Sequence, residues 1–314
     1  MITDKNSIIK IRTETDGSAI VTVDSESKIT KADFTIRLPS GGTFKVDMRI
    51  NGKEAIGDFR VSSPKLWNPN TPFLYGFSAV ISTDDGVEKA EGKFGFRSIS
   101  TNGKNVCLNG VPIFIRGYIR GATAHEHSND AHLSEEEFYR KNITEAKKFG
   151  FNTVRFHSVV PDETFFDVAD ELGMLVHIEL RPPHDIYNNL EEMVTTGTAI
   201  VPDEFLKEVV NKNFNHPSLA VYCIGNEIKN APNGTIKEIK EKIDALDGTR
   251  LFLDTCAWGE NGRPDIDIDV QHLSYYFPFG KHAKMYDDTD NLLVVGSSVD
   301  KPMKTDGLNS SLTR

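Results

Sequence analysis

The chain has 314 residues, of which 36 are Lys or Arg and 46 are Asp or Glu, so its formal net charge at pH 7 is −10. This acidic balance argues against nucleic acid or an anionic membrane as the main partner. No apolar run approaches the roughly 20 residues that a membrane-spanning helix needs. The length exceeds what one hydrophobic core usually holds, so we expect a soluble globular protein with about two domains.

The cysteines and the first residues of the chain indicate the cellular compartment in which the protein is expected. Cys107, Cys223 and Cys256 are few and far apart, which argues against a disulfide framework and against a thiolate metal site. We expect them to be buried thiols. The first residues lack the basic and apolar regions of a signal peptide, so the chain, if complete, is expected in the cytoplasm.

The first part of the chain reads as strands. From about Ser7 to Arg97, apolar and polar residues alternate with a period of two, and turn-forming pairs such as Asp16-Gly17 separate the segments. The clearest predicted strands are 18–23, 31–38, 43–48 and 75–81. Short strands at this spacing predict a small antiparallel sandwich over residues 1–98.

Beyond Gly103, helical periods alternate with buried-looking strands. Ser134 and Glu137 form a capping box, and the helix that it opens is expected to end at Gly150 in a left-handed cap. Further helices are predicted at 163–172, 203–213 and 235–246, and strands at 113–117, 153–156, 174–179, 219–224, 251–254 and 270–273. The βα order predicts a parallel barrel over 99–314, although periodicity alone does not separate a barrel from an open doubly wound sheet.

Chemistry-bearing residues follow the predicted strands. In a parallel barrel, groups just past the strand ends share one open mouth. The groups collected there are His125, Glu126 and His127, Arg155 with His157, Glu179, Asn226 with Glu227, Trp258, and Tyr275. Acids, imidazoles, amides and aromatic faces together are the composition of a carbohydrate site. A carboxyl group at Glu227 can protonate a departing sugar oxygen while Asn226 bonds a sugar hydroxyl.

Each of these residues also has a structural interpretation. Asn226 and Glu227 can begin a helix, Arg155 can serve as an ion-pair partner, and the aromatic residues can simply pack. The segment around His125 can be a solvated loop, and it lacks the helical His-Glu-x-x-His spacing of a zinc site, so we expect no metal and no cofactor. Glu179 is harder to explain structurally, because a carboxylate in an apolar strand needs a partner or a function.

Several segments, in order, resemble motifs of glycoside hydrolase family 2, the group of β-galactosidases, β-glucuronidases and β-mannosidases. They are Leu66–Tyr75, Phe94–Arg97, Leu108–Gly117, His125–His127, Phe151–Arg155, Asp170–Val176 and Asn215–Glu227. The resemblance covers nearly the whole chain. It implies an immunoglobulin-like β-sandwich at 1–98, followed at 99–314 by an α/β TIM barrel that is incomplete, with about six of its eight strands.

The resemblance also implies roles for individual residues. Glu227 would be the general acid/base, and Asn226 would bind the 2-hydroxyl of the substrate. Arg155 would lie beneath the nucleophile, Tyr275 would orient it, and Glu179 resembles the acid that ends the third strand. The nucleophilic Glu of the family belongs at the end of strand seven, and the residues after the sixth predicted strand read as loop. We therefore expect no nucleophile in this chain, which alone would be inactive or nearly so.

Two hypotheses about function follow from the sequence. The first is a retaining β-glycosidase that hydrolyses terminal β-linked sugars. The second is a non-catalytic carbohydrate-binding or scaffold protein derived from the same barrel. A replacement of the nucleophile by Glu179 or Glu126 is disfavoured, because no barrel geometry requires it. The expected partner is a carbohydrate, homo-oligomerisation through exposed strand edges stays open, and the sugar is not specified.

Overall fold

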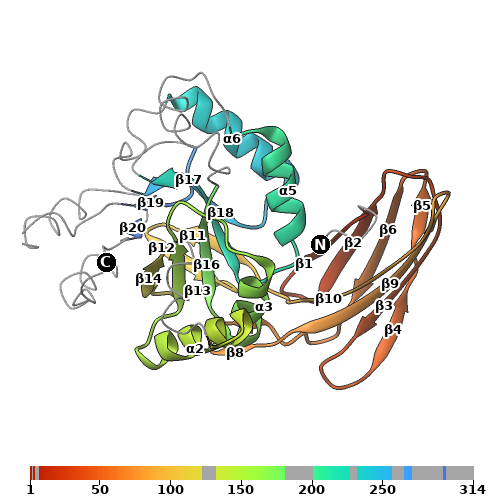
Figure 1. Ribbon diagram of the computed structural model, residues 1–314, viewed down its shortest axis with the longest axis horizontal. Coiled ribbons are helices and arrows are strands. Elements are labelled where there is room, and N and C mark those ends of the chain that lie inside the picture. Colours follow the sequence, from red (N-terminus) through yellow and green to blue (C-terminus); the bar gives the residue numbers. More distant parts are fainter. Residues whose placement is uncertain are drawn as a thin grey trace, which may run out of the picture.

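The computed structural model describes residues 1, 3, 7–121, 132–180, 201–226, 232–256, 265–270 and 293–294. Within these ranges, an antiparallel β-sandwich precedes a parallel sheet flanked by helices (Figure 1). In Figure 1 the sandwich strands, coloured red to orange, lie at one end of the molecule, and the parallel sheet with its helices lies at the other. In the described ranges, no helix is both long enough and apolar enough to cross a membrane.

The sandwich consists of two four-stranded antiparallel sheets. The first has the order β1 (Ile8–Thr13), β2 (Ser18–Asp24), β6 (Glu54–Arg60), β5 (Arg49–Asn51), and the second β10 (Gly86–Phe94), β9 (Tyr75–Thr83), β3 (Ile29–Arg37), β4 (Thr43–Val46). Burial alternates strictly along β9, as the period of two requires. The predicted sandwich is confirmed, and β1, β5, β6 and β10 complete the sheets that the clearest sequence segments began.

The first predicted strand of the barrel, 113–117, is wrong. Residues 99–113 form an antiparallel sheet of β11 (Ile99–Asn102), β12 (Asn105–Leu108) and β13 (Val111–Ile113). Asn109 and Gly110 join β12 to β13 with φ angles of 56° and 75°. Positive φ at both positions is what a type I′ hairpin turn demands, so the chain reverses here. The barrel strand is instead β14 (Gly117–Arg120).

The parallel sheet has the order β14, β15 (Thr153–Phe156), β16 (Leu175–Glu179), β17 (Leu219–Asn226), β18 (Leu251–Cys256). Between these strands run α2 (Glu135–Lys148), α3 (Glu163–Leu172), α5 (Asp203–Asn213) and α6 (Asn233–Leu246). The capping box at Ser134 is present, and Gly150 follows α2 with a left-handed φ of 84°, as the sequence predicts. Strand and helix alternation therefore follows the predicted order of a TIM barrel.

The two faces of the parallel sheet bury different residues. One face packs against the helices through a core that includes Val154, Phe156, Val176 and Ile178. The opposite, interior face buries Leu175, Val221, Leu251 and Leu253 against Trp67 and Val106. Trp67 belongs to the short β7 (Trp67–Asn68), which pairs with β8 (Thr71–Pro72), and Val106 belongs to β12. These elements close the amino-terminal end of the sheet, which leaves its carboxyl end as the mouth.

The sixth predicted strand begins at β19 (Asp269–Val270), and the rest of its predicted range, 271–273, lies outside the described residues. β19 pairs in parallel with β20 (Leu293–Val294). The interpretation of this late region as loop throughout is therefore wrong at β20. β20 lies within the aliphatic run Leu292–Val295, which has no alternation of apolar and polar residues and is therefore too short a signal to predict a strand.

Polar contacts fasten the sandwich to the barrel. The buried Arg97 donates hydrogen bonds to the backbone oxygens of Pro217, Leu219 and Thr249, at 3.0, 2.6 and 2.8 Å. Burial, together with the neighbouring Arg250, lowers the pKa of Arg97 to about 9, so it is still a cation at neutral pH. The amino-terminal ends of β17 and β18 are thus held by a residue near the end of the sandwich segment.

A glycine allows a second close contact between the barrel and the segment after β7. Gly173 ends α3 with a left-handed φ of 76°, and a Cβ atom there would lie 2.5 Å from the backbone oxygen of Pro69. Only a residue without a side chain allows this approach between the barrel and the segment that follows β7.

A buried carboxylate organises the floor of the barrel. Asp247 accepts hydrogen bonds from Tyr222 at 3.0 Å, from Arg250 at 2.7 Å, and from the backbone and hydroxyl of Thr249 at 3.0 and 2.7 Å. Burial raises the pKa of Asp247, but Arg250 and the hydrogen bonds from Thr249 outweigh burial and hold the pKa below 3.8. Asp247 is therefore a structural anion in the folded protein.

Candidate active site

Three of the predicted site residues meet at the carboxyl end of the parallel sheet. Arg155 is the third residue of β15, Glu179 is the last of β16, and Asn226 is the last of β17. Side chains alternate between the faces of a strand, and the neighbours Val154, Phe156 and Ile178 belong to the helix-facing core. Arg155 and Glu179 consequently face the interior of the barrel, at its mouth.

Direct hydrogen bonds connect these three side chains. Arg155 donates from Nε and Nη2 to Oε1 of Glu179 at 2.9 and 2.5 Å, and from Nη2 to Oδ1 of Asn226 at 2.6 Å. Arg155 is 5% exposed and Glu179 is fully buried, so solvent barely screens the pair. A guanidinium ion held by a buried carboxylate in this way fixes the orientation of the Asn226 amide.

The second oxygen of Glu179 is also occupied. The backbone N–H of Ser158 donates to Oε2 of Glu179. Ser158 has a left-handed φ of 60°, which is uncommon for a residue other than glycine and directs this N–H toward the carboxylate. Ser158 was not among the predicted site residues, because no residue pattern predicts the backbone turn after β15. Glu179 thus receives the partners that a buried carboxylate in an apolar strand requires.

Two further residues of the barrel interior lie at the site but were not predicted as site residues. His177 lies two residues before Glu179 on the same face of β16, and Cys223 lies opposite Glu179 on β17. Both are buried. Burial, and then the positive charge of Arg155, lower the pKa of His177 to about 3, so its ring is neutral at physiological pH. The signal for His177 was its two-residue spacing from Glu179, which places both on one face.

The structure separates His157 from the Arg155 network. His157 follows β15 with an exposed side chain, and its backbone N–H donates to the oxygen of Arg120 at 2.7 Å. The remaining predicted site residues lie outside the described residues: His125, Glu126, His127, Glu227, Trp258 and Tyr275. Their roles stay predictions.

Two groups of side chains in the described ranges have the composition of metal ligands. His177, Glu179 and Cys223 bring ligand atoms within 4.8 Å of one another at the site, and Asp167, Asp170 and His216 do so elsewhere. In the second group, Asp170 is already bonded to His216 at 2.7 Å and to the backbone of Ser218 at 2.9 Å. Those bonds fix the loop that leads into β17, which is a structural task.

Family models match most of the chain. The model described as "Glycosyl hydrolases family 2" matches residues 2–97, and "Glycosyl hydrolases family 2, TIM barrel domain" matches residues 99–292. The chain belongs to glycosyl hydrolase family 2. The family resemblance inferred from the sequence motifs is confirmed, and with it an immunoglobulin-like sandwich followed by part of a TIM barrel.

Relatives of this family 2 chain include β-galactosidases. One from Lactococcus lactis is 26% identical over 170 residues, which cover 53% of this chain and 17% of the relative. Another, from Aeromonas hydrophila, is 28% identical over 210 residues, which cover 62% of this chain and 19% of the relative. The chain therefore spans about a fifth of the length of these curated relatives.

Solved structures show the same fold over a larger share of the family 2 chain. A β-glucuronidase from Parabacteroides merdae has a TM-score of 0.68 at 20% identity, covering 93% of this chain and 40% of that one. A β-D-glucuronidase from Dictyoglomus thermophilum has a TM-score of 0.65 at 19% identity, covering 91% and 51%. The fold of the described elements is thus that of glycosidases in this family.

Proposed function

We propose that this chain supplies the acid/base half of a retaining β-glycosidase site for terminal β-linked sugars. Asn226, held by Arg155, carries the proposal, because it is the last residue of β17 and directly precedes Glu227 in the chain. Membership of a glycosidase family supports the reaction class. In this proposal Glu227 protonates the departing glycosidic oxygen and later activates water.

The hydrogen bonds of Asn226 support a sugar-binding role. Its Oδ1 accepts from Arg155 at 2.6 Å, so the amide nitrogen is the group that can donate to a substrate hydroxyl. Because Arg155 is itself fixed by Glu179, the amide is oriented before the substrate arrives. Orientation of this kind lowers the entropic cost of binding in the reactive geometry.

Glu179 is a positioning residue in this proposal and not the nucleophile. Both of its oxygens already accept hydrogen bonds, and its side chain is fully buried. A nucleophile must instead reach the anomeric carbon about 5 to 5.5 Å from the acid/base carboxyl. The attacking carboxylate is therefore expected from outside the described residues, in line with the family, whose nucleophile ends strand seven.

Calorimetric titration of the chain with aryl β-galactosides, β-glucuronides and β-mannosides tests the proposal. We expect one of these sugars to bind without turnover, and Asn226→Ala to weaken binding by about tenfold or more, because one hydrogen bond in a desolvated site is lost. Asn142→Ala, on α2, is the matched control and should bind as the wild type does. Failure to bind any of the three sugars, or hydrolysis that survives Glu227→Gln, would overturn the proposal.

A further inference from the structure

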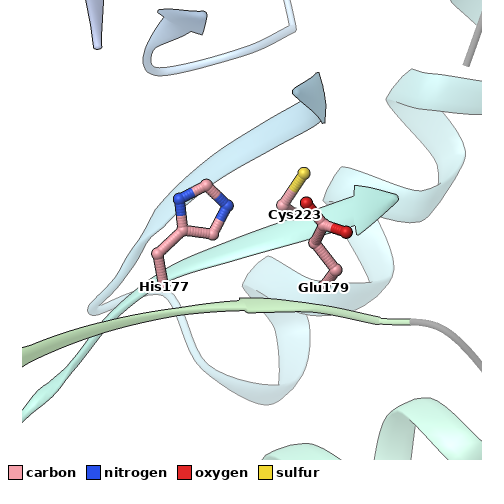
Figure 2. A group of neighbouring side chains, drawn as sticks. All are labelled: His177, Glu179 and Cys223. Atoms are coloured by element: carbon pink, nitrogen blue, oxygen red, sulfur yellow. The ribbon is translucent and has the colours of Figure 1, made fainter. Parts of the chain in front are cut away.

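The interior cluster, which we define as His177, Glu179 and Cys223, joins two neighbouring strands of the barrel. Figure 2 shows the imidazole of His177 and the carboxylate of Glu179, both on β16, close to the thiol of Cys223 on β17. One ligand atom from each side chain lies within 4.8 Å of the other two. All three side chains are at least nine-tenths buried, so their positions are set by packing rather than by solvent.

The donor set of the interior cluster suits a borderline-soft divalent cation. Nitrogen, sulfur and oxygen donors from His, Cys and Glu are the ligands that Zn²⁺ takes in proteins, and three of them leave its fourth position open. Bond lengths of about 2.0 to 2.3 Å imply ligand atoms separated by about 3.3 to 3.8 Å in a tetrahedron. The separations between ligand atoms therefore need to shorten by up to about 1.5 Å, which rotations of two side chains can supply.

The existing hydrogen bonds of Glu179 leave room for a metal bond. An ionised carboxylate offers about four lone-pair positions. Oε1 accepts two N–H groups of Arg155, and Oε2 accepts one from Ser158. One position on Oε2 is left for a cation, so the carboxylate can bind a metal while it still holds Arg155.

We propose that the interior cluster binds one Zn²⁺ ion through a ring nitrogen of His177, the sulfur of Cys223 and Oε2 of Glu179. The Cys223 thiol loses its proton to solvent as the Zn–S bond forms, and no atom changes its oxidation state. The ion cross-links β16 to β17 directly beside Arg155. The long separation of the ligands along the chain explains why cysteine spacing did not predict the site.

Metal titration of the chain tests the proposal without any assay of hydrolysis. After dialysis against a chelator, the chain is titrated with Zn²⁺ by calorimetry and with Co²⁺ by absorption spectroscopy. We expect one equivalent of each metal to bind, and Co²⁺ to give the charge-transfer band of a thiolate ligand. Zn²⁺ should also raise the melting temperature, because it binds only the folded arrangement.

Cysteine variants identify the thiolate. Cys223→Ser should abolish the Co²⁺ charge-transfer band and weaken Zn²⁺ binding by more than about 100-fold, since even the loss of an outer partner of a metal ligand costs 10- to 100-fold. Cys107→Ser is the matched control, because Cys107 is also buried but lies on β12, and it should keep both signals. Cys256→Ser should keep them as well.

If Cys223→Ser does not fold, a measurement on the wild-type chain still tests the proposal. Zn²⁺ should protect Cys223 from alkylation in partly denaturing urea, with the modified peptide identified by mass spectrometry. Absence of stoichiometric Zn²⁺ binding by the wild type would overturn the proposal. A Co²⁺ band that persists in Cys223→Ser, or that disappears in Cys256→Ser, would overturn it too.

Discussion

Replacing Glu179 by Gln tests whether the Arg155 network is the buried ion pair that the structure describes. The wild-type carboxylate accepts two hydrogen bonds from Arg155 on Oε1 and one from Ser158 on Oε2. Gln has one acceptor oxygen and one donor nitrogen, so in either orientation a donor faces a donor. The substitution also leaves the guanidinium of Arg155, 5% exposed, without its counter-charge.

The expected cost follows from this loss of charge. Removing one partner of a buried ion pair costs about 3 to 5 kcal/mol, because the other charge stays buried and uncompensated. A matched control is Glu204→Gln. Glu204 pairs with Lys207 at 3.2 Å, but their side chains are 89% and 52% exposed, so that loss should be below about 1 kcal/mol.

Urea denaturation followed by circular dichroism measures both changes, and amide hydrogen exchange of β15, β16 and β17 localises them. The double variant Arg155→Met/Glu179→Leu should be less destabilised than Glu179→Gln, since it removes both charges together. If Glu179→Gln costs no more than Glu204→Gln, the network does not hold the strand ends, and the orientation assigned to Asn226 loses its support.

Three further changes have defined outcomes. Gly173→Ala should destabilise the chain by about 1 kcal/mol or more beyond Gly150→Ala in urea titrations, because both glycines have left-handed φ, but of the two only at Gly173 would an added Cβ lie 2.5 Å from a backbone oxygen; equal losses would contradict this. The pKa of Asp247 in the folded protein lies below the value of 3.8 expected for the unfolded chain, so its ionised carboxylate stabilises the fold fully only above pH 3.8. As the pH falls below 3.8, the free energy of unfolding should therefore decrease more steeply for the wild type than for Asp247→Asn. Parallel pH profiles would refute that assignment. In a protein that carries this chain and hydrolyses aryl glycosides, Glu227→Gln should slow poor leaving groups most, and a uniform effect in a leaving-group series would exclude Glu227 as the acid.

Much of the fold was predictable because local patterns dominated it. The capping box at Ser134 and the left-handed caps at Gly150 and Gly173 each act within one turn of a helix, so their effects are written in neighbouring residues. The hairpin turn at Asn109 and Gly110 also depends only on neighbouring residues. The apolar residues that follow this turn nevertheless led to the prediction of a barrel strand at 113–117. There the turn geometry overrode the hydrophobic pattern.

The candidate site was predictable only where the topology brings strand ends together. The parallel order places Arg155, Glu179 and Asn226 at one mouth, and all three were predicted as site residues from the sequence. The contact of Ser158 with Glu179 depends on a backbone angle, and that of Cys223 with Glu179 depends on the register between β16 and β17. Neither quantity has a signature in the residue pattern of a single strand.

The hydrogen bonds of Arg97 join the sandwich and the barrel into one structural unit. The guanidinium of Arg97, near the end of the sandwich segment, donates hydrogen bonds to three carbonyl groups of the barrel. If this barrel were joined to a different sandwich, that sandwich would need a cationic side chain at the position of Arg97. Without one, the three carbonyl oxygens would be buried without a hydrogen-bond donor. Exchange of these modules between proteins is therefore constrained at Arg97, which contacts the amino-terminal end of β17, the opposite end from Asn226.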